Sequence, residues 1–110
     1  MRPTIAILGD HDRAVLTHRE IDAMLPLLAE HAEPRWVASD APELPELEGF
    51  DGIWVAPGSP YRDDDAVLRA IGRARTTGTP LLGICSGFQY LVVEYARNVA
   101  GLTEDRKSVV

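Results

Sequence analysis

The chain has one cysteine, few basic residues and no long apolar run, and each of these shortages excludes a class of protein. A single cysteine cannot form an internal disulfide, which argues against a disulfide-stapled secreted domain and favours a cytoplasmic setting. Eleven basic residues against seventeen acidic ones give a net charge of −6, a balance that repels nucleic acid. Because no apolar stretch is long enough, we expect neither a signal peptide nor a membrane span.

The remaining composition indicates one ordinary globular domain. Hydrophobic residues make up 45% and charged residues 25% of the 110 positions, which is close to the average for folded chains. A chain of this length holds one core. We therefore expect residues 1–110 to form a single domain, without repeats or low-complexity segments.

Short apolar runs alternate along the chain with segments of helical periodicity. Such an alternation predicts an α/β fold, a doubly wound parallel sheet in three layers with right-handed crossovers. The segment 39–50 is rich in proline and acidic residues and is expected to be a surface crossover with one helical turn. Strands are expected at 4–8, 34–38 (toward a sheet edge), 52–56 and 81–84, and helices at 17–31, 63–77 and 88–99.

Local signals refine the helix predictions. Thr17 followed by Glu20 is typical of a capping box, and Pro26 predicts a kink inside the first helix. Met24 is expected to fill the core. The last helix has the clearest apolar period in the chain, formed by Phe88, Leu91, Val92, Tyr95, Ala96 and Val99.

The segment 80–89, PLLGICSGFQ, is the part of the sequence that most strongly suggests chemistry. A strand runs into Cys85, a helical pattern follows at once, and Gly83 and Gly87 allow a sharp turn with close packing. The helix N-terminus under the sulfur favours the thiolate form, which is the nucleophile. The alternative is a buried, inert cysteine that behaves as a small hydrophobe.

In a parallel sheet the carboxyl ends of all strands lie along one edge, where open α/β sheets bind ligands. The loops 9–13, 57–62 and 85–87 are therefore expected to converge, which brings Gly58 and Ser59 close to Cys85. The three aspartates at 63–65 point in different directions on a helix, so we expect no metal site there. No signal for a cofactor is present.

Three stretches carry a resemblance to class I (triad) glutamine amidotransferases: GICSGFQ at 83–89, EYARNVAGL at 94–102 and DGIWVAPG at 51–58. The chain most resembles the amidotransferase domain of CTP synthase and the stand-alone proteins related to the C-terminal region of that enzyme. This resemblance implies a flavodoxin-like fold, of which the chain would be the N-terminal part.

The resemblance also implies roles for individual residues. Cys85 would attack the side-chain amide of glutamine, the substrate. The backbone N–H of Ser86 and one from the Gly58–Ser59 turn would form the oxyanion hole, and Gln89 would hold the glutamine. No cofactor and no metal is implied.

The sequence departs from the family pattern in three respects. Ser59 stands where the family has a second glycine, no histidine follows Cys85 to act as the base, and the strands are too few for the full sheet. Only His11 and His18 are expected near the sheet edge formed by the carboxyl ends of the strands. His11 is a poor candidate for the base because it would have to reach far to approach Cys85. The incomplete sheet edge predicts a homo-oligomer or a partner protein.

These departures leave several interpretations open. The chain is a fragment, a short form completed by dimerisation, or a catalytically incomplete protein that retains the turn. As functions, an amidotransferase that works only when completed is favoured over a non-enzymatic binding module and over a cysteine protein like the DJ-1/PfpI group. The tail at 103–110 has no assigned structure or role.

Overall fold

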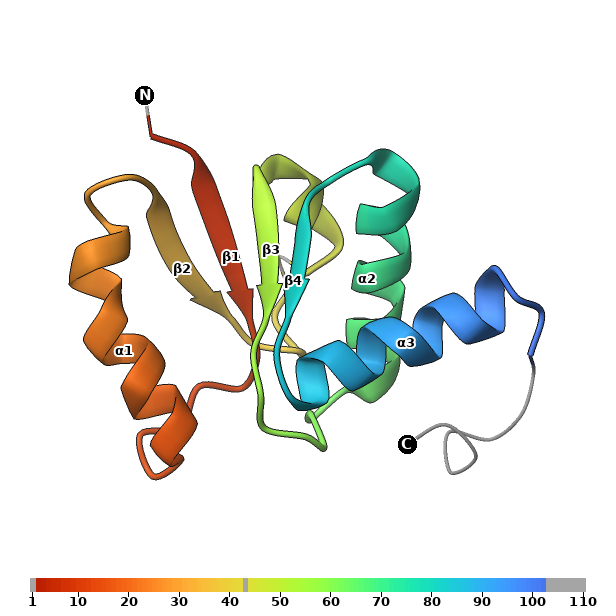
Figure 1. Cartoon of the computed structure of the whole chain (residues 1–110), viewed down its shortest axis with the longest axis horizontal. Coiled ribbons are helices and arrows are strands. Elements are labelled where there is room, and N and C mark those ends of the chain that lie inside the picture. The colour runs from red at the N-terminus through yellow and green to blue at the C-terminus, as the bar shows by residue number, and fades with distance from the viewer. Residues whose placement is uncertain (1, 43, 103–110) are drawn as a thin grey trace.

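A parallel four-stranded sheet forms the centre of the part of the chain described by the computed structural model, residues 2–42 and 44–102 (Figure 1). The strand order is β2-β1-β3-β4, and every pairing is parallel. This arrangement confirms the predicted α/β class. The elements are β1 (Thr4–Leu8), α1 (Leu16–Leu28), β2 (Glu33–Val37), η1 (Leu44–Gly49), β3 (Gly52–Val55), α2 (Asp64–Thr77), β4 (Leu81–Gly83) and α3 (Ser86–Asn98).

Helices lie on both faces of this sheet, as a doubly wound fold requires. On one face α1 packs over the centre of the sheet, where Ile21 meets Ile7 and Ala56. On the other face α2, η1 and α3 enclose a larger core that contains Leu8, Val55 and, from the helices, residues such as Val67, Ile71 and Tyr90. The edge position expected for the second strand is confirmed, since β2 has one neighbour in the sheet.

The ends of α2 follow the sequence signals, whereas the start of α1 does not. The side chain of Asp63 accepts a hydrogen bond from the N–H of Ala66, and Gly78 ends the helix in the left-handed conformation with φ of 77°. In α1 the predicted capping box is wrong. The helix begins at Leu16, so Thr17 already lies inside its first turn, and the Val15 cap makes no side-chain hydrogen bond.

Most of the apolar period of α3 faces outward, although Leu91 is partly buried against the larger core. Phe88, Tyr95 and Val99 are 58%, 54% and 47% exposed. The buried positions are instead Gly87, Tyr90, Val93 and Glu94. Gly87 lies against the backbone of Val55, and the residues one and two helical turns later therefore point the same way, into the core. The contact at the start of the helix, and not its apolar period, sets its orientation.

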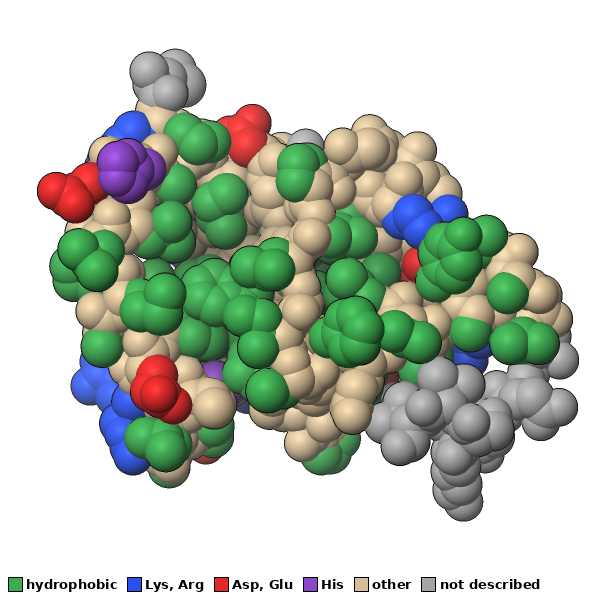
Figure 2. All heavy atoms as spheres, in the orientation of Figure 1, with side chains coloured by type: hydrophobic (Ala, Val, Ile, Leu, Met, Phe, Trp, Pro, Cys, Tyr) green, Lys and Arg blue, Asp and Glu red, His purple; other side chains and the backbone are tan. Residues whose placement is uncertain are grey.

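One part of the sheet is left uncovered between α1 and β4, and we call it the open face. Strand register aligns Trp54 with Leu82, and Leu82 is half exposed. Met24, expected in the core, is 54% exposed on the α1 side of the same region because no element of the described residues packs over it. The result is an apolar hollow of about 560 Å³, visible as hydrophobic side chains gathered between α1 and the strands (Figure 2).

Candidate functional site

Cys85 lies on a sharp turn between β4 and α3. Its backbone has φ of 57° and ψ of −122°, and among the described residues it is the one non-glycine residue with positive φ. Such a conformation costs about 1–3 kcal/mol and persists only when the surrounding packing imposes it. The side chain is exposed. The structure thus places an accessible sulfur at the start of a helix, at the position expected for a nucleophile.

Close packing of two glycines imposes this turn, and we call residues 83–87 the elbow. A Cβ at Gly87 would lie 2.1 Å from the carbonyl oxygen of Val55. A Cβ at Gly83 would lie 2.8 Å from the backbone nitrogen of Phe88. The helix can therefore sit directly on the strands only because both side chains are missing.

The loop after β3 lies beside the elbow, and we call its residues 57–60 the oxyanion loop after the role that the family resemblance implies for it. The backbone N–H groups of Gly58 and Ser59 both donate to Oγ of Ser86, with N···O distances of 3.0 Å and 3.3 Å. Gly58 needs to be glycine, since its φ is 117°. Ser59 is not among the residues with positive φ, so the serine at this position meets no glycine-only conformation. Two amides of this loop thus converge on one oxygen atom.

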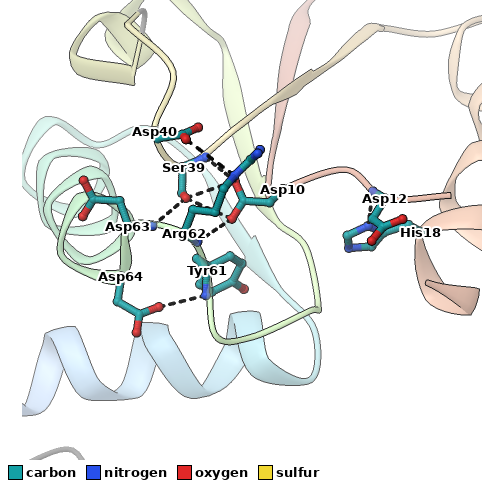
Figure 3. A network of polar contacts seen from close by, with 9 residues as sticks. All are labelled: Asp10, Asp12, His18, Ser39, Asp40, Tyr61, Arg62, Asp63 and Asp64. Carbon is teal, nitrogen blue, oxygen red and sulfur yellow. Dashed lines mark hydrogen bonds and ion pairs between the residues drawn. The ribbon is translucent and has the colours of Figure 1, made fainter. Parts of the chain in front are cut away.

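Asp10 connects the segment after the oxyanion loop to the other loops at the carboxyl ends of the strands through hydrogen bonds (Figure 3). Its carboxylate accepts hydrogen bonds from the N–H and Oγ of Ser39 and from the N–H of Arg62, with the latter at 2.7 Å. Burial raises the pKa of Asp10, but these hydrogen bonds outweigh it and hold the pKa below its ordinary value. One side chain therefore joins the loops that follow β1, β2 and β3. The sequence showed Asp10 only as one of several loop polar residues.

Two tyrosines support the same loop from the face of the sheet that α2, η1 and α3 enclose, which we call the covered face. The Tyr61 hydroxyl donates to the carbonyl of Ala56, and the rings of Tyr61 and Tyr90 meet edge to face at 4.9 Å. The N–H of Tyr61 and the hydroxyl of Tyr90 both donate to Asp64, at 3.0 Å and 2.8 Å. Burial raises the pKa of Tyr61. Sequence reasoning missed this support, because no local pattern connects these residues.

The two histidines near the carboxyl ends of the strands, His11 and His18, form hydrogen bonds with groups other than Cys85. Nε2 of His11 lies 2.7 Å from Asp22, and the hydrogen bond lowers the pKa of that carboxyl. His18 is 2% exposed, and its Nδ1 accepts from the N–H of Asp12 while its Nε2 contacts the carbonyl of Pro57. Both nitrogens of His18 are thus occupied, so it has no free position from which to take a proton from Cys85.

Gln89, the remaining residue of the expected site, lies one helical turn after Cys85 and is exposed. Its backbone N–H donates to the carbonyl of Cys85 at 3.1 Å, within the first turn of α3. The structure therefore brings Cys85, Ser86 and the Gly58–Ser59 turn together, with Gln89 on the adjacent turn of the helix.

The described residues, 2–42 and 44–102, contain neither a metal-binding cluster nor a membrane-spanning helix. Within these ranges no group of three histidine, cysteine, aspartate or glutamate side chains is placed to hold a metal ion. Nor is any helix in them long and apolar enough to cross a membrane.

The sequence is similar to part of several CTP synthases. It is 48% identical over 73 residues to the enzyme of Thermobifida fusca, which is 62% of this chain and 13% of that protein. It is 45% identical over 73 residues to the enzyme of Archaeoglobus fulgidus, with 63% and 13% covered. The chain thus spans about an eighth of the length of these curated relatives.

A solved structure and a family model extend the match over most of the chain. The glutaminase domain of Trypanosoma brucei CTP synthase, solved with bound acivicin, superposes with a TM-score of 0.71 at 27% identity, covering 90% of this chain and 42% of that one. The model of the class I glutamine amidotransferase family matches residues 21–109. The elbow, the parallel sheet and these matches agree, and the chain belongs to the class I glutamine amidotransferase family.

Proposed function

We propose that the chain carries the nucleophile part of a glutaminase site, in which Cys85 attacks the side-chain amide of glutamine. The observation that carries the proposal is the convergence of the Gly58 and Ser59 N–H groups on one oxygen at the first residue of α3, directly after Cys85. Fixed amides that converge on one point can stabilise the oxyanion of acyl transfer. The bound acivicin in the Trypanosoma brucei domain supports a ligand site in this fold.

In the proposed reaction Sγ of Cys85 bonds to the amide carbon of glutamine, and the carbonyl oxygen becomes an oxyanion. The N–H groups of Ser86 and of the Gly58–Ser59 turn hold that oxyanion. The C–N bond then breaks, and the nitrogen takes up the proton that the Cys85 thiol gave up and leaves as ammonia. Water cleaves the thioester, which releases glutamate and restores the thiol. Gln89 contacts the bound glutamine from the next turn of α3.

Proton transfer in this scheme needs a group that the described residues do not bring to Cys85. No histidine follows Cys85 in the sequence, His18 has both nitrogens occupied, and His11 is paired with Asp22. We therefore propose that the chain binds and positions glutamine but turns it over only when further polypeptide supplies the proton acceptor.

The open face indicates where such polypeptide would pack. It exposes Leu82 and Ile84 at the free edge of the sheet, and the indole N–H of Trp54 is buried without a hydrogen-bond partner among the described residues. The chain also corresponds to only 42% of the Trypanosoma brucei domain. We propose that the cover is polypeptide that continues the sheet beyond β4, as in a complete amidotransferase domain. Sedimentation of the isolated chain as a stable dimer would point instead to a second copy.

Trapping of Cys85 by a glutamine-derived chloroketone tests the proposed nucleophile. The chain is incubated with the L-reagent, and the adduct is located by mass spectrometry of its peptides. We expect a single adduct on Cys85, slowed by acivicin, with little reaction of the D-reagent or of Cys85→Ser. A folded sample that forms no adduct contradicts the proposal. Selective oxidation of Cys85 by peroxide in such a sample would favour the DJ-1/PfpI interpretation.

A further inference from the structure

The peptide between Pro57 and Gly58 is held at both of its ends. Its carbonyl oxygen lies 2.8 Å from Nε2 of His18, and its N–H donates to Oγ of Ser86 at 3.0 Å. In a planar trans peptide the C=O and N–H bonds point in opposite directions. A ring that fixes the carbonyl therefore also fixes the direction in which the N–H points, which here is toward the elbow.

The contacts of His18 determine which of its nitrogens carries the proton. The backbone N–H of Asp12 can only donate, so Nδ1 of His18 is the acceptor of that 3.0 Å hydrogen bond. The neutral ring then has its proton on Nε2, and Nε2 donates to the carbonyl of Pro57. The ring is 2% exposed, so water does not compete for either contact. His18 thus joins the loop after β1 to the oxyanion loop.

Gly58 makes this contact necessary for the orientation of the peptide. A glycine with φ of 117° has no side chain to restrict the rotation of the preceding peptide. The His18 ring also fills the space next to it, because a Cβ at Gly58 would lie 3.0 Å from Nε2. The glycine permits more than one peptide orientation, and the histidine selects one.

We propose that His18 is a positioning residue of the glutamine site, which holds the Pro57–Gly58 peptide so that the Gly58 N–H faces the elbow. In the resting protein Oγ of Ser86 occupies this N–H, and the oxyanion takes its place during the reaction. The use of the N–H in catalysis rests on the proposed function, whereas the orientation of the peptide does not.

Two substitutions at His18 and one elsewhere separate positioning from general stability. His18→Gln retains an N–H near the place of Nε2, and His18→Met fills a similar volume without a donor. His31→Met, at an exposed position near the other end of α1, is the matched control. Hydrogen exchange of the Gly58 amide, followed by NMR, reports the orientation of the peptide without any need for reactivity. The Ala56 amide, which bonds to Leu8 in the sheet, is the internal reference.

If His18 holds the peptide, His18→Met raises the exchange rate of the Gly58 amide by about tenfold or more while that of Ala56 changes little. His18→Gln restores most of the protection, and His31→Met has no effect. Unchanged exchange of Gly58 in a folded His18→Met protein overturns the inference. If His18→Met does not fold, His18→Gln decides the question by itself, because this variant still has an N–H donor at position 18. Loss of Gly58 protection in His18→Gln, while Ala56 remains protected, then overturns the inference.

A second readout tests whether the positioned N–H is used. The alkylation rate of Cys85 by the glutamine-derived chloroketone is divided by its rate with iodoacetamide, a displacement that forms no oxyanion. The ratio should fall by about 100-fold in His18→Met and recover in His18→Gln. An unchanged ratio overturns the catalytic part of the inference. A wild-type protein that never reacts with the chloroketone counts against the proposed function, and the exchange of Gly58 then decides the role of His18 by itself.

Discussion

On one face of the sheet α2, η1 and α3 enclose a continuous hydrophobic core, whereas on the other face α1 covers the centre and leaves β4 exposed. The supports of the elbow lie on the covered side. Gly87 packs on Val55, and Tyr61 and Tyr90 meet under the oxyanion loop. The elbow is therefore built on the face that α2, η1 and α3 enclose, whereas no element among the described residues covers the open face.

A buried ion pair also holds α3 against α2. Glu94 is 1% exposed and accepts two hydrogen bonds from Arg75 of α2, both at 2.9 Å, and a third from Asn98 at 3.0 Å. The carboxylate thus directs one side of α3 toward α2. The apolar residues on its other side remain exposed, and they extend the unpartnered surface beyond the sheet (Figure 2).

The largest effect is expected where α3 meets the covered face. Gly87→Ala would place a methyl group 2.1 Å from the carbonyl of Val55, so the helix must move off the strand. We expect a loss of more than about 4 kcal/mol in the free energy of unfolding, measured in urea. Gly49→Ala, where no atom lies within 4 Å of the added Cβ, should change it by less than about 0.5 kcal/mol. Equal stability of the two variants would show that Gly87 does not lie in close contact with the carbonyl of Val55.

A pair of truncations compares the two faces directly. Ile71→Ala removes a side chain that is 1% exposed in the covered core and should cost about 2–5 kcal/mol. Leu82→Ala, on the open face, should cost less than about 1 kcal/mol because that side chain is already half exposed. A large loss for Leu82→Ala would mean that the open face is covered in solution, and sedimentation at several concentrations would then show whether a second copy covers it.

The strain at the elbow predicts a variant that gains stability. Cys85→Gly removes the steric cost of a φ of 57° and should raise the free energy of unfolding by about 1 kcal/mol, after the entropy cost of glycine is subtracted. Cys85→Ser keeps the strain and should remain close to the wild type. Thermal unfolding of the three proteins checks this, and a glycine variant less stable than the serine variant would argue against a strained turn.

The smallest effect concerns pH. The hydrogen bonds from Arg75 lower the pKa of Glu94 below its ordinary value of 4.5, so the stabilisation is fully present above that value and is lost as the pH falls through the lowered pKa. Glu94→Gln should therefore be most costly at neutral pH and progressively less so in acid, and its cost should stay below the cost of about 3–5 kcal/mol for breaking a fully buried pair, because the Arg75 side chain that remains is 31% exposed. Asp10 and Asp22 titrate in both proteins and cancel in the difference. A difference that grows as the pH falls would contradict this assignment.

The sequence was sufficient for features that depend on local patterns. The four strands follow from short apolar runs between glycines and prolines, and the elbow follows from small residues on both sides of Cys85. The orientation of α3 was not predictable in this way. Its apolar period marks a face without saying what that face meets, and the contact of Gly87 with the strand turns it outward.

Long-range polar contacts were also out of reach of sequence reasoning. His18 and Pro57 are far apart in the chain, and no spacing rule relates a helix residue to the carbonyl of a later loop. The same holds for Asp10, which collects hydrogen bonds from Ser39 and Arg62. These contacts arise only when the carboxyl ends of parallel strands are assembled along one edge.

Protection of Cys85 by glutamine would show whether the elbow and the oxyanion loop together form a glutamine site. The rate of Cys85 alkylation by iodoacetamide is measured by mass spectrometry at increasing glutamine concentration, with asparagine as the matched control. We expect glutamine to slow the reaction severalfold with saturation in the millimolar range or below, whereas asparagine, one methylene shorter, should leave the rate unchanged. Equal rates with and without glutamine, in a protein shown to be folded, would mean that the elbow and the oxyanion loop do not form a glutamine site.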